Sequence, residues 1–321
     1  MATPVIRPAT LDDAGLASDL MTAAYPDEPD DPLVTRFRWA HPRDGWSMGR
    51  FIAHVDSQPI AYLSFAHGAW DQVRDGNCDI GAEVERSHQS EEVLNELWEW
   101  IAEQAVADGA RILSAYAAED EPMVLEALGR LGYERERSEK VWELDFNKHG
   151  KRLLAEARAA RERMKNEDVE LLPLAEWPGP ETFRRLHLLN EATVQDVPTS
   201  HPIPPQSFAN FMDRMAAPDL PHDRLWLARH GDRPVAMSFL RFPPVRGNVW
   251  TGYTCSDPEY RGRGIARAVK LQSLAQAIEL GVPFVRTAND SENPSMLHIN
   301  ETLGYDPRPG FVSHEKRVSS R

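Results

Sequence analysis

Hydrophobic and polar positions near the start of the chain alternate between strand-like and helix-like spacing. Val5–Ala9 has the pattern of a short strand, and Asp12–Ala24 has that of an amphipathic helix. The apolar face of this helix is formed by Leu11, Leu16, Leu20 and Met21. An acidic, proline-rich loop is expected over Pro26–Pro32. Arg50–Asp56 and Ile60–Ala66 are predicted as two strands joined by the turn 57–59.

The same strand-turn-strand pattern returns at Arg224–His230 and Pro234–Phe239. It is followed by an extended run, Val249–Ser256, that is rich in β-branched and aromatic residues, and by a helical pattern over Ile265–Leu280. Phe311–Val318 is predicted to be the last strand, before a polar tail. Upstream, two helices are predicted at 180–193 and 207–216. The loop between them, 195–206, carries Pro198, Pro202, Pro204 and Pro205.

The two halves match at one constant separation along the chain. The pairs that share this separation are Gly109 and Gly281, Pro122 and Pro294, Gly132 and Gly304, and Tyr133 and Tyr305. Pro59 and Pro234 match at a slightly larger separation. Such long-period self-similarity indicates one architecture built twice. We predict a first domain at residues 1–146, a connecting helix at 147–168 and a second domain at 169–321. The connecting helix has charges on most sides, which predicts that it is solvated.

Composition narrows the possible partners. The chain has 321 residues, enough for two domains, and a formal net charge of −14, which argues against a nucleic-acid substrate and mildly favours a cationic acceptor. Cys78 and Cys255 provide neither a disulfide framework nor a metal site, so no metal is expected. No signal core and no run of about 18 apolar residues occurs, so we expect a cytoplasmic protein that does not bind membranes.

The segment Asp257–Ala266, with the sequence DPEYRGRGIA, joins the extended run to the following helix. Strand, glycine-rich turn and helix in this order form a phosphate cradle, because backbone N–H groups and the helix dipole face the anion. The segment has neither the Gly-Lys-Ser/Thr of a P-loop nor the spacing of a Rossmann turn. Arg261 and Arg263 add charge that a pyrophosphate can use.

This turn resembles the Arg/Gln-x-x-Gly-x-Gly/Ala turn of GNAT-family acetyltransferases. The segment Thr287–Tyr305 is similar to the segment that follows in that family, with a strand, an Asn-bearing turn, a short helix and a Leu-Gly-aromatic end. With the internal repeat, the chain resembles a bacterial group of two-copy GNATs that includes mycothiol synthase. The acidic residue that mycothiol synthase has on the strand before the cradle is missing from Trp250-Thr251-Gly252, which argues against mycothiol synthesis.

The resemblance implies an α/β fold of two GNAT-like domains, each with a central mixed sheet flanked by helices, and acetyl-CoA as co-substrate. The residues implied to hold the pantetheine are Thr254, Cys255 and Ser256, and those implied to hold the pyrophosphate are Arg261, Gly262, Arg263, Gly264, Ile265 and Ala266. Cys255 is interpreted as a strand residue rather than a nucleophile, since a GNAT transfers directly. Asn289 is expected to contact the pantetheine. Asn293 has two interpretations, a cofactor contact or a helix N-cap before Pro294.

Catalytic residues are harder to assign. Asn300 stands where many GNATs place a tyrosine acid, but an amide cannot donate a catalytic proton. Either Asn300 orients the CoA sulfur or a water, or the thiolate leaves without a side-chain acid. Asp196 is a candidate at the acceptor side, in an Asp-x-Pro turn that is also an ordinary turn former. Glu191 and His201 are weaker candidates there.

The two copies differ at the cradle. At the constant separation of the repeat, Arg261–Gly264 aligns with Gln89-Ser90-Glu91-Glu92, and Asn289 and Asn300 align with Ala117 and Leu128. We therefore predict one CoA per chain, bound by the second copy. The predicted function is transfer of acetyl from acetyl-CoA to a small polar amine by direct attack, in a monomer or weak homodimer. The alternative is a non-catalytic CoA-sensing or interaction protein with the same fold.

Overall fold

The computed structural model describes residues 3–201 and 203–318. Met1, Ala2, Pro202 of the predicted loop and the tail after Val318 lie outside these ranges. The strands are β1 (Val5–Pro8), β2 (Trp46–Val55), β3 (Gln58–Gly68), β4 (Asn77–Val84), β5 (Ile112–Ala118), β6 (Glu134–Asp145), β7 (Glu170–Pro173), β8 (Leu225–His230), β9 (Arg233–Arg241), β10 (Trp250–Ser256), β11 (Phe284–Asp290) and β12 (Asp306–Arg317). The α-helices are α1 (Ala14–Ala24), α2 (Pro32–Ala40), α3 (Glu91–Ala107), α4 (Pro122–Arg130), α5 (Phe146–Lys165), α6 (Pro180–Val194), α7 (Phe208–Met215), α8 (Ile265–Glu279) and α9 (Pro294–Leu303).

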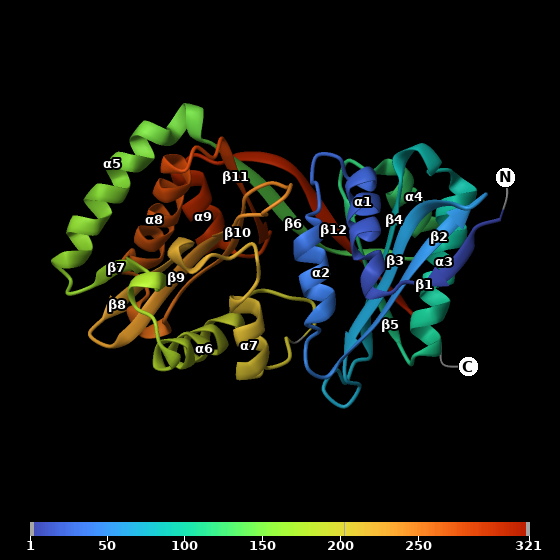
Figure 1. Cartoon of the computed structure of the whole chain (residues 1–321), viewed down its shortest axis with the longest axis horizontal. Helices are drawn as coiled ribbons and strands as arrows, with labels where there is room; N and C mark the ends of the chain where they lie inside the picture. The colour runs from blue at the N-terminus through green and yellow to red at the C-terminus, as the bar shows by residue number, and fades with distance from the viewer. Residues whose placement is uncertain (1–2, 202, 319–321) are drawn as a thin grey trace.

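All twelve strands form one mixed sheet that runs through both halves of the molecule (Figure 1). Their order is β1-β2-β3-β4-β5-β12-β6-β11-β10-β9-β8-β7. The predicted α/β class, with a mixed sheet flanked by helices, is confirmed. The two central sheets that we expected are joined edge to edge into a single sheet.

The join is an exchange of last strands. The last strand of the first half, β6, pairs antiparallel with β11 of the second half, and Lys140 lies opposite Asn289. The last strand of the second half, β12, pairs antiparallel with β5 of the first half, and Val312 lies opposite Ala117. The strands β6 and β12 pair with each other at the centre. First-half side chains on β6 thus lie beside β11, the strand that carries Asn289. The domain boundaries at 146 and 169 stay a prediction.

The first residues of equivalent strands and helices in the two halves are separated by the same interval as the sequence repeat. The strands β5 and β11 begin at Ile112 and Phe284, and the helices α4 and α9 begin at Pro122 and Pro294, so both pairs keep the same separation. The strands β3 and β9 begin at Gln58 and Arg233, one residue before the matched prolines Pro59 and Pro234. Glycines and prolines that fix turns and first helical turns keep this register, because their backbone requirements survive when other side chains change.

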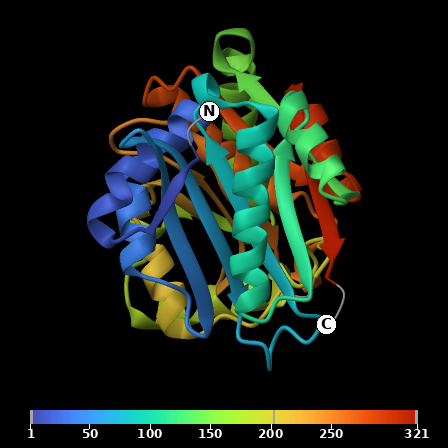
Figure 2. The ribbon, with the colours of Figure 1, turned by 90° about the vertical axis from the view of Figure 1, so that its right-hand side faces the viewer.

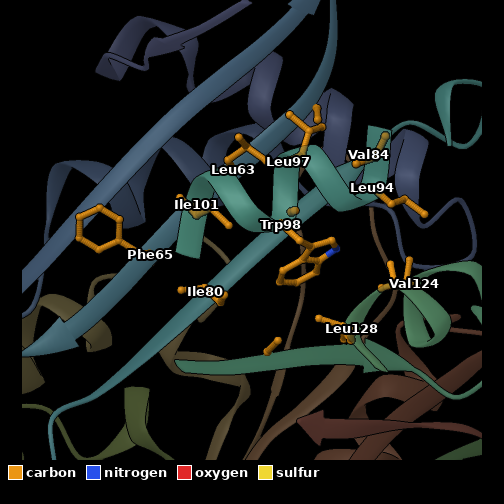
Figure 3. Close-up of a cluster of buried hydrophobic side chains, with 14 of the residues drawn as sticks. Leu63, Phe65, Ile80, Val84, Leu94, Leu97, Trp98, Ile101, Val124 and Leu128 are labelled. Atoms are coloured by element: carbon orange, nitrogen blue, oxygen red, sulfur yellow. The ribbon is translucent and has the colours of Figure 1, made fainter. Parts of the chain in front are cut away.

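The first half has an apolar core between sheet and helices. Helix α3 lies across one face of the first-half strands (Figure 2), and its Leu94, Leu97, Trp98 and Ile101 pack with α4 against β3 and β4 (Figure 3). On the opposite face, α1 packs on Ile52 and Tyr62. In the second half, α8 and α5 share one cluster, while α6 and α7 form another against β8 and β9.

Three local predictions were wrong. Pro32 begins α2 rather than ending a loop, because the Asp31 carboxylate accepts the N–H groups of Leu33 and Val34. The first hairpin turns at Asp56 and Ser57, both with positive φ, and not at 57–59. The connecting helix, α5, is not solvated on all sides. Its apolar positions at spacings of three and four, Leu153, Ala157, Ala160 and Met164, are buried against α8.

Candidate functional site

The site centres on a gap between β10 and β11. These parallel strands are paired only at Trp250 and Arg286, whereas the equivalent strands β4 and β5 are paired at four positions, Asn77–Ile80. β10 stays paired with β9 through Ser256, with a bulge between Thr251 and Tyr253. Within the described residues, the edge of β10 that faces β11 is therefore unpaired toward its carboxyl end. A strand edge of this kind offers backbone groups to an extended ligand.

The turn after β10 leaves the N-terminus of α8 open. Gly262 and Gly264 have φ of 76° and 74°, in the left-handed region where a side chain is strained. Gly264 is the N-cap of α8, no side chain caps the helix, and its first turn has no acidic residue. The first N–H groups of the helix therefore remain available, and the helix dipole favours an anion there. Ile265 is buried as the anchor of the helix, and Ala266 follows it half-buried.

Three arginines surround this turn. Arg261 pairs with the carboxylate of Asp196, and Arg263 lies 2.5 Å from the carboxylate of Glu167. The structure thus places Asp196 on the cradle itself, and its acceptor-side role stays a prediction. Sequence reasoning missed Arg163 of α5. Its Nη2 lies 3.4 Å from where a Cβ on Gly264 would stand. No motif pointed to it, because α5 lies outside the cradle segment.

The side chains at the end of β10 are oriented by the sheet. The Thr254 hydroxyl lies 2.9 Å from that of Ser238, and the carbonyl of Ser256 accepts a hydrogen bond of 3.4 Å from Arg261 Nε. Cys255 is buried, and burial raises the pKa of its thiol to about 11. A thiol with that pKa is protonated at neutral pH. This agrees with Cys255 being a strand residue rather than a nucleophile.

A series of three hydrogen-bonded polar side chains, mostly buried, lies behind the gap. Lys270 of α8 is 0% exposed, and its Nζ donates to Asn300 Oδ1 at 3.0 Å. Asn300 Nδ2 donates in turn to Asn289 Oδ1 at 2.5 Å. Asn300 is also 0% exposed, while Asn289, at the end of β11, is half-buried. These hydrogen bonds bring two predicted site residues together, and of the two only Asn289 is partly exposed.

Lys270 was missed by sequence reasoning. Burial lowers the pKa of its ammonium from 10.5 to about 7. The signal was present, since Lys270 interrupts the apolar residues Ala268, Val269 and Leu271. In the alignment of the two copies, Lys270 corresponds to Trp98 of the first-half core.

Asn293 acts as a helix cap. Its Oδ1 accepts the N–H of Met296 at 3.2 Å, directly before Pro294 at the first position of α9. This is the second of the two interpretations. A cofactor contact by Asn293 stays a prediction. Of the two weaker candidates, Glu191 accepts the N–H of Gln206 at 3.3 Å, and His201 lies between Asp75 and Glu315 at 2.6 and 2.8 Å. Burial opposes the charged form of His201, but the two carboxylates raise its pKa overall.

The corresponding place in the first half is closed. The Ser90 hydroxyl caps α3 by accepting the N–H of Val93 at 3.3 Å, and Glu91 and Glu92 occupy the first helical turn. The Gln89 side chain bonds back to the carbonyl of Val84 at 3.1 Å. The helix N-terminus is thus already satisfied and carries negative charge, so it does not suit an anion.

Among residues 3–201 and 203–318, no group of His, Cys, Asp or Glu side chains is arranged to hold a metal ion. A helix long and apolar enough to cross a membrane is likewise absent from that part of the chain.

Comparison with known proteins agrees with this geometry. Residues 187–305 match the family model "Acetyltransferase (GNAT) family". A tandem GNAT protein from the clavulanic acid biosynthesis pathway is similar, with 16% identity and a TM-score of 0.76, covering 99% of this chain and 100% of that one. A GCN5-related N-acetyltransferase from Sphaerobacter thermophilus has 16% identity and a TM-score of 0.69, covering 100% and 98%. A GNAT-family acetyltransferase from Colwellia psychrerythraea has 14% identity and a TM-score of 0.61, covering 98% and 100%.

Comparison with curated protein sequences gave no significant match. The family matched in the second half uses acetyl-CoA for acetyl transfer, and the similar structures extend the fold over the whole chain. Specific features of mycothiol synthase receive no support. Residues 187–305 are therefore a GNAT acetyltransferase domain, in a chain whose full length has the tandem GNAT fold.

Proposed function

We propose that this chain transfers acetyl from acetyl-CoA to a small polar amine by direct attack, with CoA held by the second half only. The observation that carries the proposal is the difference between the two helix N-termini. The N-terminus of α8 is uncapped and surrounded by Arg261, Arg263 and Arg163, while that of α3 is capped by Ser90 and acidic. A pyrophosphate is favoured at the first and disfavoured at the second.

The residues around the gap fit the parts of acetyl-CoA. When bound, acetyl-CoA supplies the acetyl thioester. The open amides of α8 and the arginines suit the pyrophosphate, and the unpaired edge of β10 suits the amide-bearing pantetheine. Arg261 and Arg263 would exchange their carboxylate partners, Asp196 and Glu167, for phosphate oxygens. Both pairs are exposed and cost little to break.

The polar chain behind the gap orients Asn289. Because Asn289 Oδ1 is occupied by Asn300 Nδ2, its own Nδ2 is left to donate into the gap. We propose that Asn300 acts through Asn289 as a positioning residue and does not touch CoA, since it is 0% exposed. No side-chain acid is assigned to the leaving thiolate. Because a thiol has an ordinary pKa near 8.5, the CoA thiolate is a good enough leaving group to depart without a side-chain acid.

The test is thiol release from acetyl-CoA over a panel of small amines. The expected result is turnover on at least one polar amine by the wild type and none above background by Gly264→Glu. Acetyl-CoA binding without turnover on any amine would favour a CoA-sensing protein instead. Absence of acetyl-CoA binding would contradict the proposal altogether.

The proposal extends to the setting of the reaction. The two cysteines, Cys78 and Cys255, are buried and unbridged, which suits a reducing, cytoplasmic compartment. We propose a small-molecule acceptor, a chain that needs neither nucleic acid, membrane nor metal, and a monomer or weak homodimer.

A further inference from the structure

A recessed cavity of about 200 Å³ lies beside the end of β11, between the two halves. Its lining includes Asp290, the residue after Asn289, and the loop segment 198–201 of the second half. It also includes Asp79 of β4, Tyr116 of β5 and Glu139 of β6, all from the first half. Glu139 reaches this place through the strand exchange, because β6 pairs with β11 and Glu139 lies opposite Asp290.

Two carboxylates in this cavity form no direct ion pair among the described residues, although the positive charges of Arg43 and His201 act on Asp79 from a greater distance. Glu139 makes no side-chain hydrogen bond there, and Asp79 makes only a long contact of 3.5 Å with Asn77. Burial raises the pKa of both carboxyls, although Asp79 remains accessible from the cavity. The neighbouring Arg137 does not neutralise them, since it is paired with Asp290 at 2.8 Å and Glu292 at 2.7 Å. A bound amine would supply the direct ion pair that neither carboxylate has.

A second cavity, of about 350 Å³, adjoins the first and shares Arg43, Trp46 and Ala66 with it. Arg214 of α7 lines it, and no carboxylate is paired with Arg214 or Arg43 in residues 3–201 and 203–318. Burial, with repulsion from Arg241 and Arg43, lowers the pKa of Arg214 to about 10. Arg241 itself is paired with Asp219 at 2.8 Å. Asp213 lines the cavity without forming an ion pair to the described residues.

The second cavity also presents an unused donor. Gln206 accepts a hydrogen bond of 3.0 Å from Arg214, and its buried Nε2 has no partner in the described structure. Two neighbouring guanidiniums and a free amide N–H lack only an oxyanion to satisfy them. Arg214 and Arg43 repel each other and neither is in an ion pair, although Glu191 attracts Arg214 and Asp79 attracts Arg43 from a greater distance, so a bound oxyanion would stabilise both arginines.

We propose that the two cavities form one acceptor site, and that the acceptor is an amine that also carries an oxyanion, either a carboxylate or a phosphate. Its oxyanion binds Arg214, Arg43 and Gln206, and its ammonium group binds Asp79 and Glu139. One proton passes to a carboxylate, the neutral amine attacks the thioester carbonyl, and the C–S bond breaks as a second amine proton leaves with the thiolate to give CoA thiol. This inference rests on the proposed acetyl transfer and names the substrate class of that site. It assigns the degenerate first half a function, because Arg43, Asp79 and Glu139 all come from it.

The first test compares acceptors in matched pairs, each an anionic amine with its neutral counterpart: L-alanine with L-alaninamide, and phosphoethanolamine with ethanolamine. We expect kcat/KM to be about tenfold or more higher for at least one anionic member, as a charge-assisted hydrogen bond allows. The pair that shows the preference distinguishes carboxylate from phosphate. Equal or better use of the neutral members would overturn the proposal.

Arginine variants test which residues bind the anionic group of the acceptor. Arg214→Gln and Arg43→Gln should each remove most of the preference through KM, and should lower kcat/KM for the neutral amines much less than for the anionic ones. Arg214→Lys should restore part of it. Arg185→Gln is the matched control, because Arg185 pairs with Glu181 on α6 outside both cavities. Loss of activity on neutral and anionic amines alike would show a structural role and contradict the assignment.

A second test does not need turnover. Inorganic phosphate is titrated into the wild type with CoA already saturating, and into Gly264→Glu, so that the cradle does not take it. Saturable binding that weakens about tenfold or more in Arg214→Gln is expected. No saturable binding would overturn the oxyanion site even if acetyl transfer is real. Phosphate binding without turnover on any amine would contradict the proposed function but would still support the oxyanion site.

Discussion

The N-termini of α3 and α8 are built at the same place in two copies of one fold, yet only one of them suits an anion. Helix α3 begins with a Ser90 cap and two carboxylates, and helix α8 begins with Gly264 in a left-handed conformation and no cap. A capped helix has already used the N–H groups that a phosphate needs. A repeated fold thus loses or keeps a ligand site through a few residues at a helix terminus, while the register of its elements is preserved.

The buried faces of α3 and α8 also differ in polarity. Trp98 of α3 packs in an apolar core with Leu128, while Lys270 of α8 is buried and donates a hydrogen bond to Asn300. An apolar interior needs no polar partners, and a buried ammonium requires them. The first half thus uses this position for packing alone. The second half keeps a polar chain that ends at Asn289, at the gap.

The largest expected effect comes from making the second cradle like the first. Gly264→Glu places a side chain at a φ of 74° and a carboxylate among the amides that would face pyrophosphate. We expect acetyl-CoA binding to weaken by about 3 kcal/mol or more, from charged hydrogen bonds lost and like-charge repulsion. Isothermal calorimetry measures it.

The matched control is Gly281→Glu. Gly281 has a φ of 79°, with no atom within 4 Å of an added Cβ, and follows the opposite end of the same helix. It should carry a similar backbone penalty of about 1 kcal/mol in stability and bind acetyl-CoA as the wild type does. An equal loss of affinity in both variants would mean that strain in α8, and not the cradle, explains the effect.

A second prediction concerns the pH dependence of stability. The folded chain holds Lys270 with a pKa of about 7, and its ordinary value is 10.5. Between these values the unfolded chain binds a proton that the folded chain lacks, so the free energy of unfolding rises with pH. Between pH 7 and pH 9 we expect the wild type to gain about 2 kcal/mol relative to Lys270→Met. Urea unfolding at several pH values measures the difference. Parallel pH profiles would contradict a depressed lysine pKa.

The smallest effect is expected in the first half. Ser90→Ala removes the cap of α3 and should lower the free energy of unfolding by about 1 kcal/mol, whereas Ser90→Gly should cost only a few tenths. Neither variant should change acetyl-CoA affinity, and neither should Glu91→Gln with Glu92→Gln. Urea unfolding and calorimetry report the two quantities separately. A more than twofold change in affinity would show that the first helix N-terminus contributes to a CoA site.

The sequence predicted the repeat, the helices and strands of the second half and the position of the cradle, because glycine and proline requirements are local. It did not predict the exchange of β6 and β12, since which strand lies beside which is decided by pairing between distant segments. The position of Glu139 on β6, opposite the last residue of β11, could not be predicted for that reason. Lys270 interrupts a run of apolar residues, but a lysine on a helix is usually exposed, and only the packing of α8 shows that this one is buried.

One CoA per chain, bound by the second half, is the central claim, and calorimetric titration of acetyl-CoA into the full-length chain tests it most directly. The predicted result is a stoichiometry of one in the wild type, and an affinity at least about 100-fold weaker in Gly264→Glu under the same conditions. Two sites per chain, or wild-type affinity in Gly264→Glu, would contradict the claim.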